Sequence, residues 1–206
     1  MRYAKINSLD ISNGEGIGVA VFVQGCHFHC KGCFNKETWD FNGGKEWNDE
    51  IKQQFIELIS KPYIKRVSIL GGEPLADENL ELTQTLIGLI FQTSLKINKK
   101  IKIWLYTGYV LETLRNDVIT ANQTIFSCNR DELYMAINTY NDDKRIKRNN
   151  IALVCDYIVD GQFEIDKQDL TYSKVKFAGS TNQRIIDVKK TLKKGELVLY
   201  EQSSEI

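Results

Sequence analysis

The 206-residue sequence predicts an α/β fold with a largely parallel, curved sheet. Short apolar runs rich in β-branched residues end at glycines or turn residues, which is typical of buried strands. Segments with apolar residues at helical spacing lie between these runs, and this alternation favours right-handed βαβ units. The composition, 42% hydrophobic and 26% charged, is that of an ordinary globular domain and excludes a disordered chain.

The first buried strand is expected at residues 18–25, with the sequence GVAVFVQG. The first helix should begin behind Asn48, whose side chain can cap the amino end, and should stop near Pro62. Between them, Ile51, Phe55 and the following apolar residues recur at intervals of three and four.

The same alternation continues along the chain. Strands are expected at residues 66–70, 101–106 and 151–159, whereas leucines and isoleucines at helical spacing predict a helix around residues 82–90. A further short helix should follow at about residues 110–115. We therefore expect an open sheet or one partly curled into a barrel.

Two segments fit this alternation poorly. Residues 122–150 contain the charged run Asp142–Arg148 where a short connection is expected, so we interpret them as an insertion of helix and loop. Residues 189–206 form a lysine-rich C-terminal extension in which residues 196–200 resemble an edge strand. The chain as a whole, residues 1–206, is expected to be a single domain.

The charge balance indicates no polyanionic partner. Lys and Arg number 27 and Asp and Glu also number 27, so the formal net charge is zero. A protein that coats nucleic acid or an anionic membrane normally carries a basic surplus. The sequence also shows no signal peptide and no apolar run long enough to span a membrane, so we expect a cytoplasmic protein.

Three of the five cysteines lie within eight residues. Cys26, Cys30 and Cys33 are spaced C-x3-C-x2-C directly after the first predicted strand, which lets three thiolates of one loop reach a single inorganic centre. A four-iron cluster with three cysteine ligands keeps one iron open, whereas a structural zinc site closes four ligands. Zinc bound by the three cysteines, with His27, His29 or a distant residue as the fourth ligand, stays an alternative.

The other two cysteines, Cys128 and Cys155, stand alone in the sequence. We interpret each as a small buried hydrophobic residue or a thiol without a role.

Two further motifs follow predicted strands. Gly71–Pro74 (GGEP) comes after the strand at residues 66–70, and Thr107–Tyr109 (TGY) comes after the strand at residues 101–106. Paired glycines expose backbone polar groups to a ligand, and Glu73 is suited to hold an ammonium group. Either motif alone is also an ordinary turn. Because the carboxyl ends of parallel strands meet at one edge, all three motifs should lie close together.

These residues resemble the radical S-adenosylmethionine superfamily. The match is narrowed by Asp10–Ile11, Asn13–Gly14, Gly32–Asn35, Thr38–Trp39, Trp104, Val159–Gly161, Phe163, Gly179–Ser180 and Asn182–Gln183. With these motifs, residues 1–115 and 151–188 are similar to the activating enzymes of anaerobic (class III) ribonucleoside-triphosphate reductase, which are glycyl-radical activating enzymes.

The resemblance implies a partial (β/α) barrel and a glycyl radical generated on the reductase. It implies one [4Fe-4S] cluster with Cys26, Cys30 and Cys33 as ligands, and S-adenosylmethionine as the second cofactor. The residues that would bind this cofactor are Gly32, Cys33, Phe34, Gly71, Gly72, Glu73 and Thr107. It further implies a reduced flavodoxin- or ferredoxin-type electron donor and a monomer or homodimer.

Several questions stay open at this point. The 122–150 insertion and the tail are longer than the family pattern, and both bear on the surface that would meet the partner. Asn182 and Arg184 are candidates to reach the cofactor or the reductase. The alternatives are a radical S-adenosylmethionine enzyme with another substrate, or a zinc-stabilised binding module.

Overall fold

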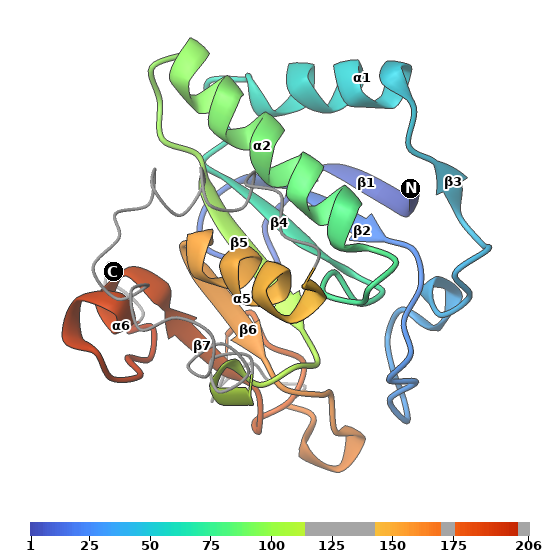
Figure 1. Cartoon of the computed structure of the whole chain (residues 1–206), viewed down its shortest axis with the longest axis vertical. Helices are drawn as coiled ribbons and strands as arrows, with labels where there is room; N and C mark the ends of the chain where they lie inside the picture. Colours follow the sequence, from blue (N-terminus) through green and yellow to red (C-terminus); the bar gives the residue numbers. More distant parts are fainter. Residues whose placement is uncertain (114–142, 170–175, 202–206) are drawn as a thin grey trace.

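The computed structural model describes residues 1–113, 143–169 and 176–201. Within these residues the fold is mixed α/β, built on one seven-stranded sheet with strand order β3-β1-β2-β4-β5-β6-β7 (Figure 1). The strands are β1 (Arg2–Asp10), β2 (Gly18–Val23), β3 (Lys45–Glu46), β4 (Arg66–Gly71), β5 (Lys102–Thr107), β6 (Tyr157–Asp160) and β7 (Arg184–Asp187).

The centre of the sheet is parallel, as the sequence predicts. Strands β2, β4, β5 and β6 pair in parallel with one another in that order. The outer strands run the other way: β1 pairs antiparallel with β2, β3 with β1, and β7 with β6. Because β3 and β7 lie at opposite edges, the sheet is not closed into a barrel.

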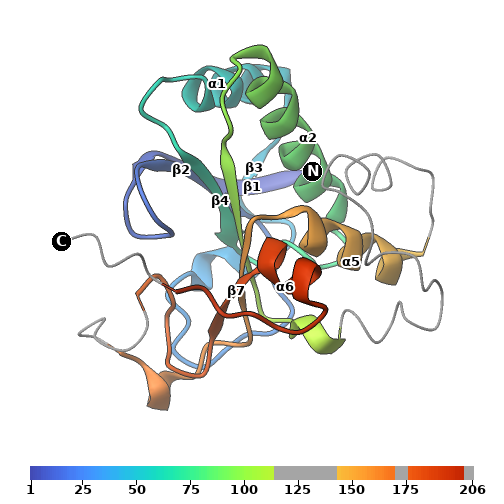
Figure 2. The same ribbon diagram turned by 90° about the vertical axis from the view of Figure 1, so that its left-hand side faces the viewer.

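Three helices cover one face of the sheet. Figures 1 and 2 show α1 (Asp49–Ile59), α2 (Leu80–Lys96) and α5 (Lys144–Val154) on the same side, with α2 packed between the other two. The short helix α6 (Val188–Lys194) follows β7, and two single 3-10 turns, η1 (Lys36–Thr38) and η3 (Ile165–Lys167), lie in loops.

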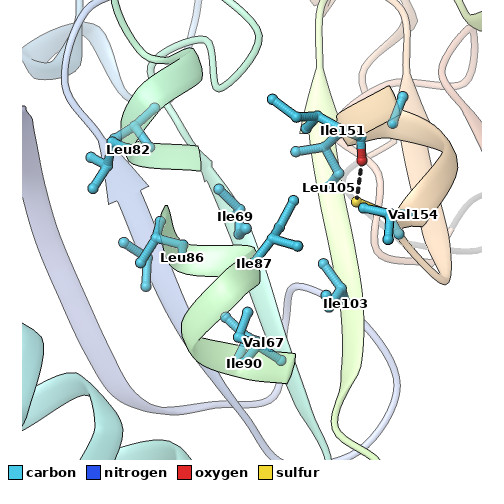
Figure 3. Close-up of a cluster of buried hydrophobic side chains, with 14 of the residues drawn as sticks. Val67, Ile69, Leu82, Leu86, Ile87, Ile90, Ile103, Leu105, Ile151 and Val154 are labelled. Carbon is cyan, nitrogen blue, oxygen red and sulfur yellow. Dashed lines mark hydrogen bonds between the residues drawn. The ribbon is translucent and has the colours of Figure 1, made fainter. Parts of the chain in front are cut away.

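The main core lies between the sheet and these helices. Strand side chains alternate between faces, so Val67 and Ile69 of β4 point toward the helices, where they meet apolar side chains of α2 and α5 (Figure 3). Their neighbours Ser68 and Leu70 point to the opposite face. The helix layer therefore fixes which side of the sheet is left for a ligand site.

Several sequence predictions on local structure are confirmed. The Asn48 side chain accepts a hydrogen bond from the Ile51 amide at 3.0 Å, and α1 ends before Pro62. Residues 198–200 pair beside β7 through hydrogen bonds from Asp187 to Val198 and from Tyr200 to Ile185, as expected of an edge segment.

The predicted strand at residues 151–159 is wrong in its first half. Residues up to Val154 complete α5, and strand β6 begins only at Tyr157. Asp143 caps the amino end of α5, so the charged residues that follow Asp143 form the first turns of this helix, which precedes β6. An apolar run of this length does not distinguish a buried helix end from a strand.

Strand β1 has no counterpart in the sequence prediction. It is a nine-residue strand between β3 and β2 with mostly half-buried or exposed side chains, so the apolar alternation that marks a strand is weak.

Several sequence interpretations fall on other parts of the chain. Cys128, residues 122–142 of the insertion, the end of the 110–115 helix and the last five residues of the extension lie outside the described residues. Cys155 is buried in the main core, where its thiol contacts the Ile151 carbonyl oxygen at 3.1 Å (Figure 3). In the part of the chain that the structure describes, no helix is long and apolar enough to cross a membrane.

Candidate functional site

A cavity of about 390 Å³ lies at the carboxyl ends of β2, β4 and β5. It brings together the three sequence motifs, which lie between Cys26 and Tyr109 along the chain. Its lining includes Cys26, Cys30, Cys33, Phe34, Gly71, Gly72, Glu73, Thr107 and Gly108. The expected convergence of the motifs is therefore confirmed as geometry. Of the predicted cofactor residues, only Gly32 does not line the cavity.

The cysteine loop follows the carboxyl end of β2 and is closed by backbone hydrogen bonds. Its ends are fixed by hydrogen bonds from the Gly25 amide to the Thr38 carbonyl (2.7 Å) and from the Cys26 amide to the Trp39 carbonyl (3.0 Å). Gly32 has a φ of 76°, a conformation that favours glycine. A Cβ at this position would also lie 2.2 Å from the Ile165 side chain.

The donor set fits an iron–sulfur cluster. Burial raises the pKa of the Cys26 and Cys30 thiols, and a bound metal displaces such protons because thiolate is the ligand. Among residues 1–113, 143–169 and 176–201, no three His, Cys, Asp or Glu side chains gather closely enough to hold one metal ion. The three thiols instead line one cavity, and a cluster spreads its thiolate ligands over separate irons.

The paired glycines let the second loop lie against the first. The Gly72 amide donates to the Val23 carbonyl at 2.9 Å, and the Glu73 amide donates to the Gly25 carbonyl at 2.8 Å. A Cβ at Gly72 would lie 2.3 Å from the Gly25 carbonyl oxygen, which no side chain permits. The glycine pair is therefore required by close backbone approach rather than by a turn alone.

Glu73 presents a fully buried carboxylate beside the cysteine loop. Its Oε1 accepts hydrogen bonds from the Leu75 amide (2.8 Å) and the Thr107 hydroxyl (2.7 Å), and its Oε2 accepts one from the Gly108 amide (2.7 Å). Burial raises the pKa of Glu73 to about 7, although these hydrogen bonds and the charge of Arg148 act in the opposite direction. An ammonium group in the cavity would favour the ionised form.

Thr107 therefore acts through Glu73 in this geometry. Its hydroxyl donates to the carboxylate and accepts a hydrogen bond from the Tyr109 amide at 3.1 Å. Asn79 has a comparable role that the sequence reasoning missed: its side-chain amide donates to the Gly25 carbonyl (3.1 Å) and the Glu73 carbonyl (2.9 Å). No motif marks Asn79, which sits directly before a helix like any capping residue.

A buried ion pair anchors the segment before β2. Arg66 is fully buried and donates to the Asp10 carboxylate at 2.6 Å and to the Ser68 hydroxyl at 2.6 Å; Ser68 in turn donates to the Asn13 carbonyl. Although burial opposes ionisation, the hydrogen bond and charge of Arg66 hold the pKa of Asp10 below its usual value. This network fixes the position of the segment that contains Asp10 and Asn13. Asn13 itself lines the cavity.

The far wall of the cavity comes from the loop after β6. The Phe163 ring lies 5.0 Å from the Phe34 ring, and Gln162 and Phe163 both line the cavity. Arg184, by contrast, is held by Asp160 and Glu112 through ion pairs of 2.5 and 2.6 Å. Neither Arg184 nor Asn182 lines the cavity, and the Asn182 side chain donates to the Gln162 carbonyl.

Comparisons with known proteins match this arrangement. A family model described as "4Fe-4S single cluster domain" matches residues 12–186, a range that contains all three motifs. The anaerobic ribonucleoside-triphosphate reductase-activating protein of Haemophilus influenzae is 36% identical over 116 residues, covering 55% of this chain and 72% of the relative. This chain belongs to the family of anaerobic ribonucleoside-triphosphate reductase-activating proteins.

Other relatives carry the same name and extend the match. The activating protein of Pasteurella multocida is 28% identical over 187 residues, which cover 90% of this chain and 96% of the relative. That of Enterobacteria phage T4 is 33% identical over 115 residues, 56% of this chain and 71% of the relative. The family description supports a single 4Fe-4S cluster, as the cysteine spacing predicts.

Proposed function

We propose that this protein activates an anaerobic ribonucleoside-triphosphate reductase by generating a glycyl radical on it. When bound, the [4Fe-4S] cluster would supply one electron that splits S-adenosylmethionine into methionine and a 5′-deoxyadenosyl radical, which takes a hydrogen atom from a reductase glycine. The names of the relatives and the single-cluster family model support this activity.

The observation that carries the proposal is the meeting of three thiols and one buried carboxylate in a single cavity. The thiols of Cys26, Cys30 and Cys33 would hold three irons and leave the fourth open to the amino and carboxylate groups of S-adenosylmethionine. Glu73 would receive the ammonium group, since it is the buried carboxylate beside the cysteine loop.

Other residues would orient the cofactor and exclude water. Gly71 and Gly72 would help Glu73 to receive its methionine ammonium group, Thr107 would hold Glu73 in place, and Gly32 and Phe34 would line the cofactor beside the cluster. The unclosed, largely parallel sheet supports an incomplete (β/α) barrel of the radical S-adenosylmethionine type, which would leave one side open to a polypeptide loop.

The remaining parts of the proposal concern the cellular context. We propose a reduced flavodoxin- or ferredoxin-type protein as electron donor, a cytoplasmic location, and a monomer or homodimer. The domain proposal is a single domain over residues 1–206, with the insertion at about 122–150 and the extension at about 189–206.

Anaerobic reconstitution tests the cofactor part of the proposal. Purified protein supplied with iron and sulfide should turn brown, retain about four irons per chain, and release 5′-deoxyadenosine from S-adenosylmethionine after reduction. Colourless protein that retains one tightly bound zinc, with no release of 5′-deoxyadenosine, would overturn it and favour a zinc-stabilised binding module.

A further inference from the structure

The charged run that opens α5 contacts the loop that carries Glu73 through Lys144, which pairs with Asp77, and through Arg148. Arg148 lies on α5, and its Nε donates to the Leu75 carbonyl at 2.9 Å. One of its terminal nitrogens pairs with the Asp77 carboxylate. Both partners belong to the loop that carries Glu73, so Arg148 ties α5 directly to that loop.

The same guanidinium also lies over an aromatic ring of another loop. The Arg148 Cζ is 5.3 Å from the centre of the Tyr109 ring, an arrangement that favours a cation–π contact. Tyr109 belongs to the TGY motif, whose Gly108 amide donates to Glu73. Arg148 therefore contacts two of the three motif loops, the GGEP loop and the TGY loop.

Tyr109 carries this connection on to the cysteine loop. Its hydroxyl lies 3.3 Å from His27 Nε2, and its ring packs edge-on against Phe28 with centroids 5.1 Å apart. Phe28 in turn fills the space over Gly108, where an added Cβ would lie 2.6 Å from the ring. An unbroken series of contacts thus runs from Arg148 through Tyr109 to the residues between Cys26 and Cys30.

We propose that Arg148 is a positioning residue for S-adenosylmethionine: through Tyr109 it fixes the cysteine loop relative to the loop that carries Glu73. This inference rests on the proposed function, because it assigns the two loops to the cluster and to the cofactor ammonium. Its positive charge also favours the ionised form of Glu73, which supports the same role.

The ion pair between Arg148 and Asp77 contributes little to folding by itself. The Arg148 side chain is 16% exposed and Asp77 is 38% exposed, and partly exposed ion pairs contribute about 0–1 kcal/mol to folding. The geometry instead requires a planar guanidinium, since one group donates to a carbonyl, pairs with a carboxylate and stacks on a ring. A lysine ammonium carries the charge but lacks the planar fork.

The test uses Arg148→Met and Arg148→Lys in the reconstituted full chain, with Arg145→Met as the matched control. Arg145 lies on the same helix, is 61% exposed and pairs with Asp143, away from the cavity. The main measurement is the Kd for S-adenosylmethionine by equilibrium dialysis without reductant, so that no turnover occurs. Iron content, and kcat for 5′-deoxyadenosine release at saturating cofactor, are measured beside it.

We expect Arg148→Met to keep the parent's iron content and a kcat within about twofold, and to bind S-adenosylmethionine about tenfold more weakly. The Kd of Arg148→Lys should lie between those of the parent and Arg148→Met, and the Kd of Arg145→Met should match that of the parent. An unchanged Kd in Arg148→Met would overturn the inference while the parent still cleaves the cofactor. A parent that neither binds nor cleaves S-adenosylmethionine would refute the proposed function itself.

A second variant covers the case in which Arg148→Met does not fold. Asp77→Asn removes the charged partner of Arg148 at an exposed position and should weaken binding in the same direction by about threefold. Equal affinity of Asp77→Asn and the parent would then count against the positioning role.

Discussion

Replacing Glu73 by Gln should flatten the pH dependence of folding stability in the cluster-free protein. Burial raises the pKa of Glu73 to about 7 in the folded chain, whereas an unfolded Glu has an ordinary value near 4.5. The unfolded state therefore loses its proton first as the pH rises. Stability associated with the neutral group is complete below pH 4.5, declines between about 4.5 and 7, and stays at its lower level above that.

The magnitude follows from the gap between the two pKa values. That gap corresponds to about 3 kcal/mol of unfolding free energy lost between pH 4.5 and pH 8 through this one group. Glutamine cannot ionise, so the variant lacks this decline. Its amide nitrogen would face the Gly108 amide in place of Oε2, and this mismatch lowers stability by about 1–3 kcal/mol at every pH.

Urea unfolding of parent and variant at pH 5 and pH 8 measures both effects. The parent should lose about 2–3 kcal/mol more than the variant between the two pH values, because part of the decline lies below pH 5, while all other titrating groups cancel in the comparison. If both proteins show the same pH dependence, the raised pKa is wrong. In that event the reasoning that ties Glu73 to an incoming cation loses its electrostatic basis.

Four further substitutions test separate parts of the site. Cys30→Ala should abolish cluster assembly and cofactor cleavage together, whereas the Cys155→Ser protein should retain the parent's iron content. Iron retained in Cys30→Ala, or lost in Cys155→Ser, would contradict the ligand assignment. Gly72→Ala should lower the unfolding free energy by roughly 1–3 kcal/mol through two broken backbone hydrogen bonds, and unchanged urea unfolding would disprove the close approach. Asp10→Asn leaves the guanidinium of Arg66 buried without a counter-charge and should destabilise by about 3–5 kcal/mol, so a loss below about 1 kcal/mol would rule out a buried pair.

The sequence predicts the cavity at the carboxyl ends of the parallel strands well, because the motifs that mark it are local. The cysteine spacing, the GGEP loop and the TGY turn each follow a run of β-branched residues, and parallel strands bring their carboxyl ends together. The cavity lined by Cys26, Gly72 and Thr107 follows from that rule alone. The βαβ arrangement is predictable for the same reason, since the helical spacing of α2 lies between two buried strands.

Other features depend on contacts between distant residues and leave no local mark. In the sequence, Arg66 is only a charged residue at the start of a strand. It is fully buried because it pairs with Asp10, and this partner cannot be recognised from the sequence because it lies 56 residues away. Arg148 falls in a charged run that a solvated helix surface would also produce, and only its contacts with Leu75 and Tyr109 reveal its position. The apolar residues after it fit a strand as well as a helix, because periodicity is ambiguous over such a short run.

The most direct test of the proposed function is the electron paramagnetic resonance spectrum of the anaerobic reductase after incubation with this protein. The reconstituted protein, S-adenosylmethionine and a reductant should produce a stable glycyl radical signal on the reductase, and the Cys30→Ala variant should produce none. Absence of that signal, with a protein that still releases 5′-deoxyadenosine, would contradict the assignment of the reductase as substrate.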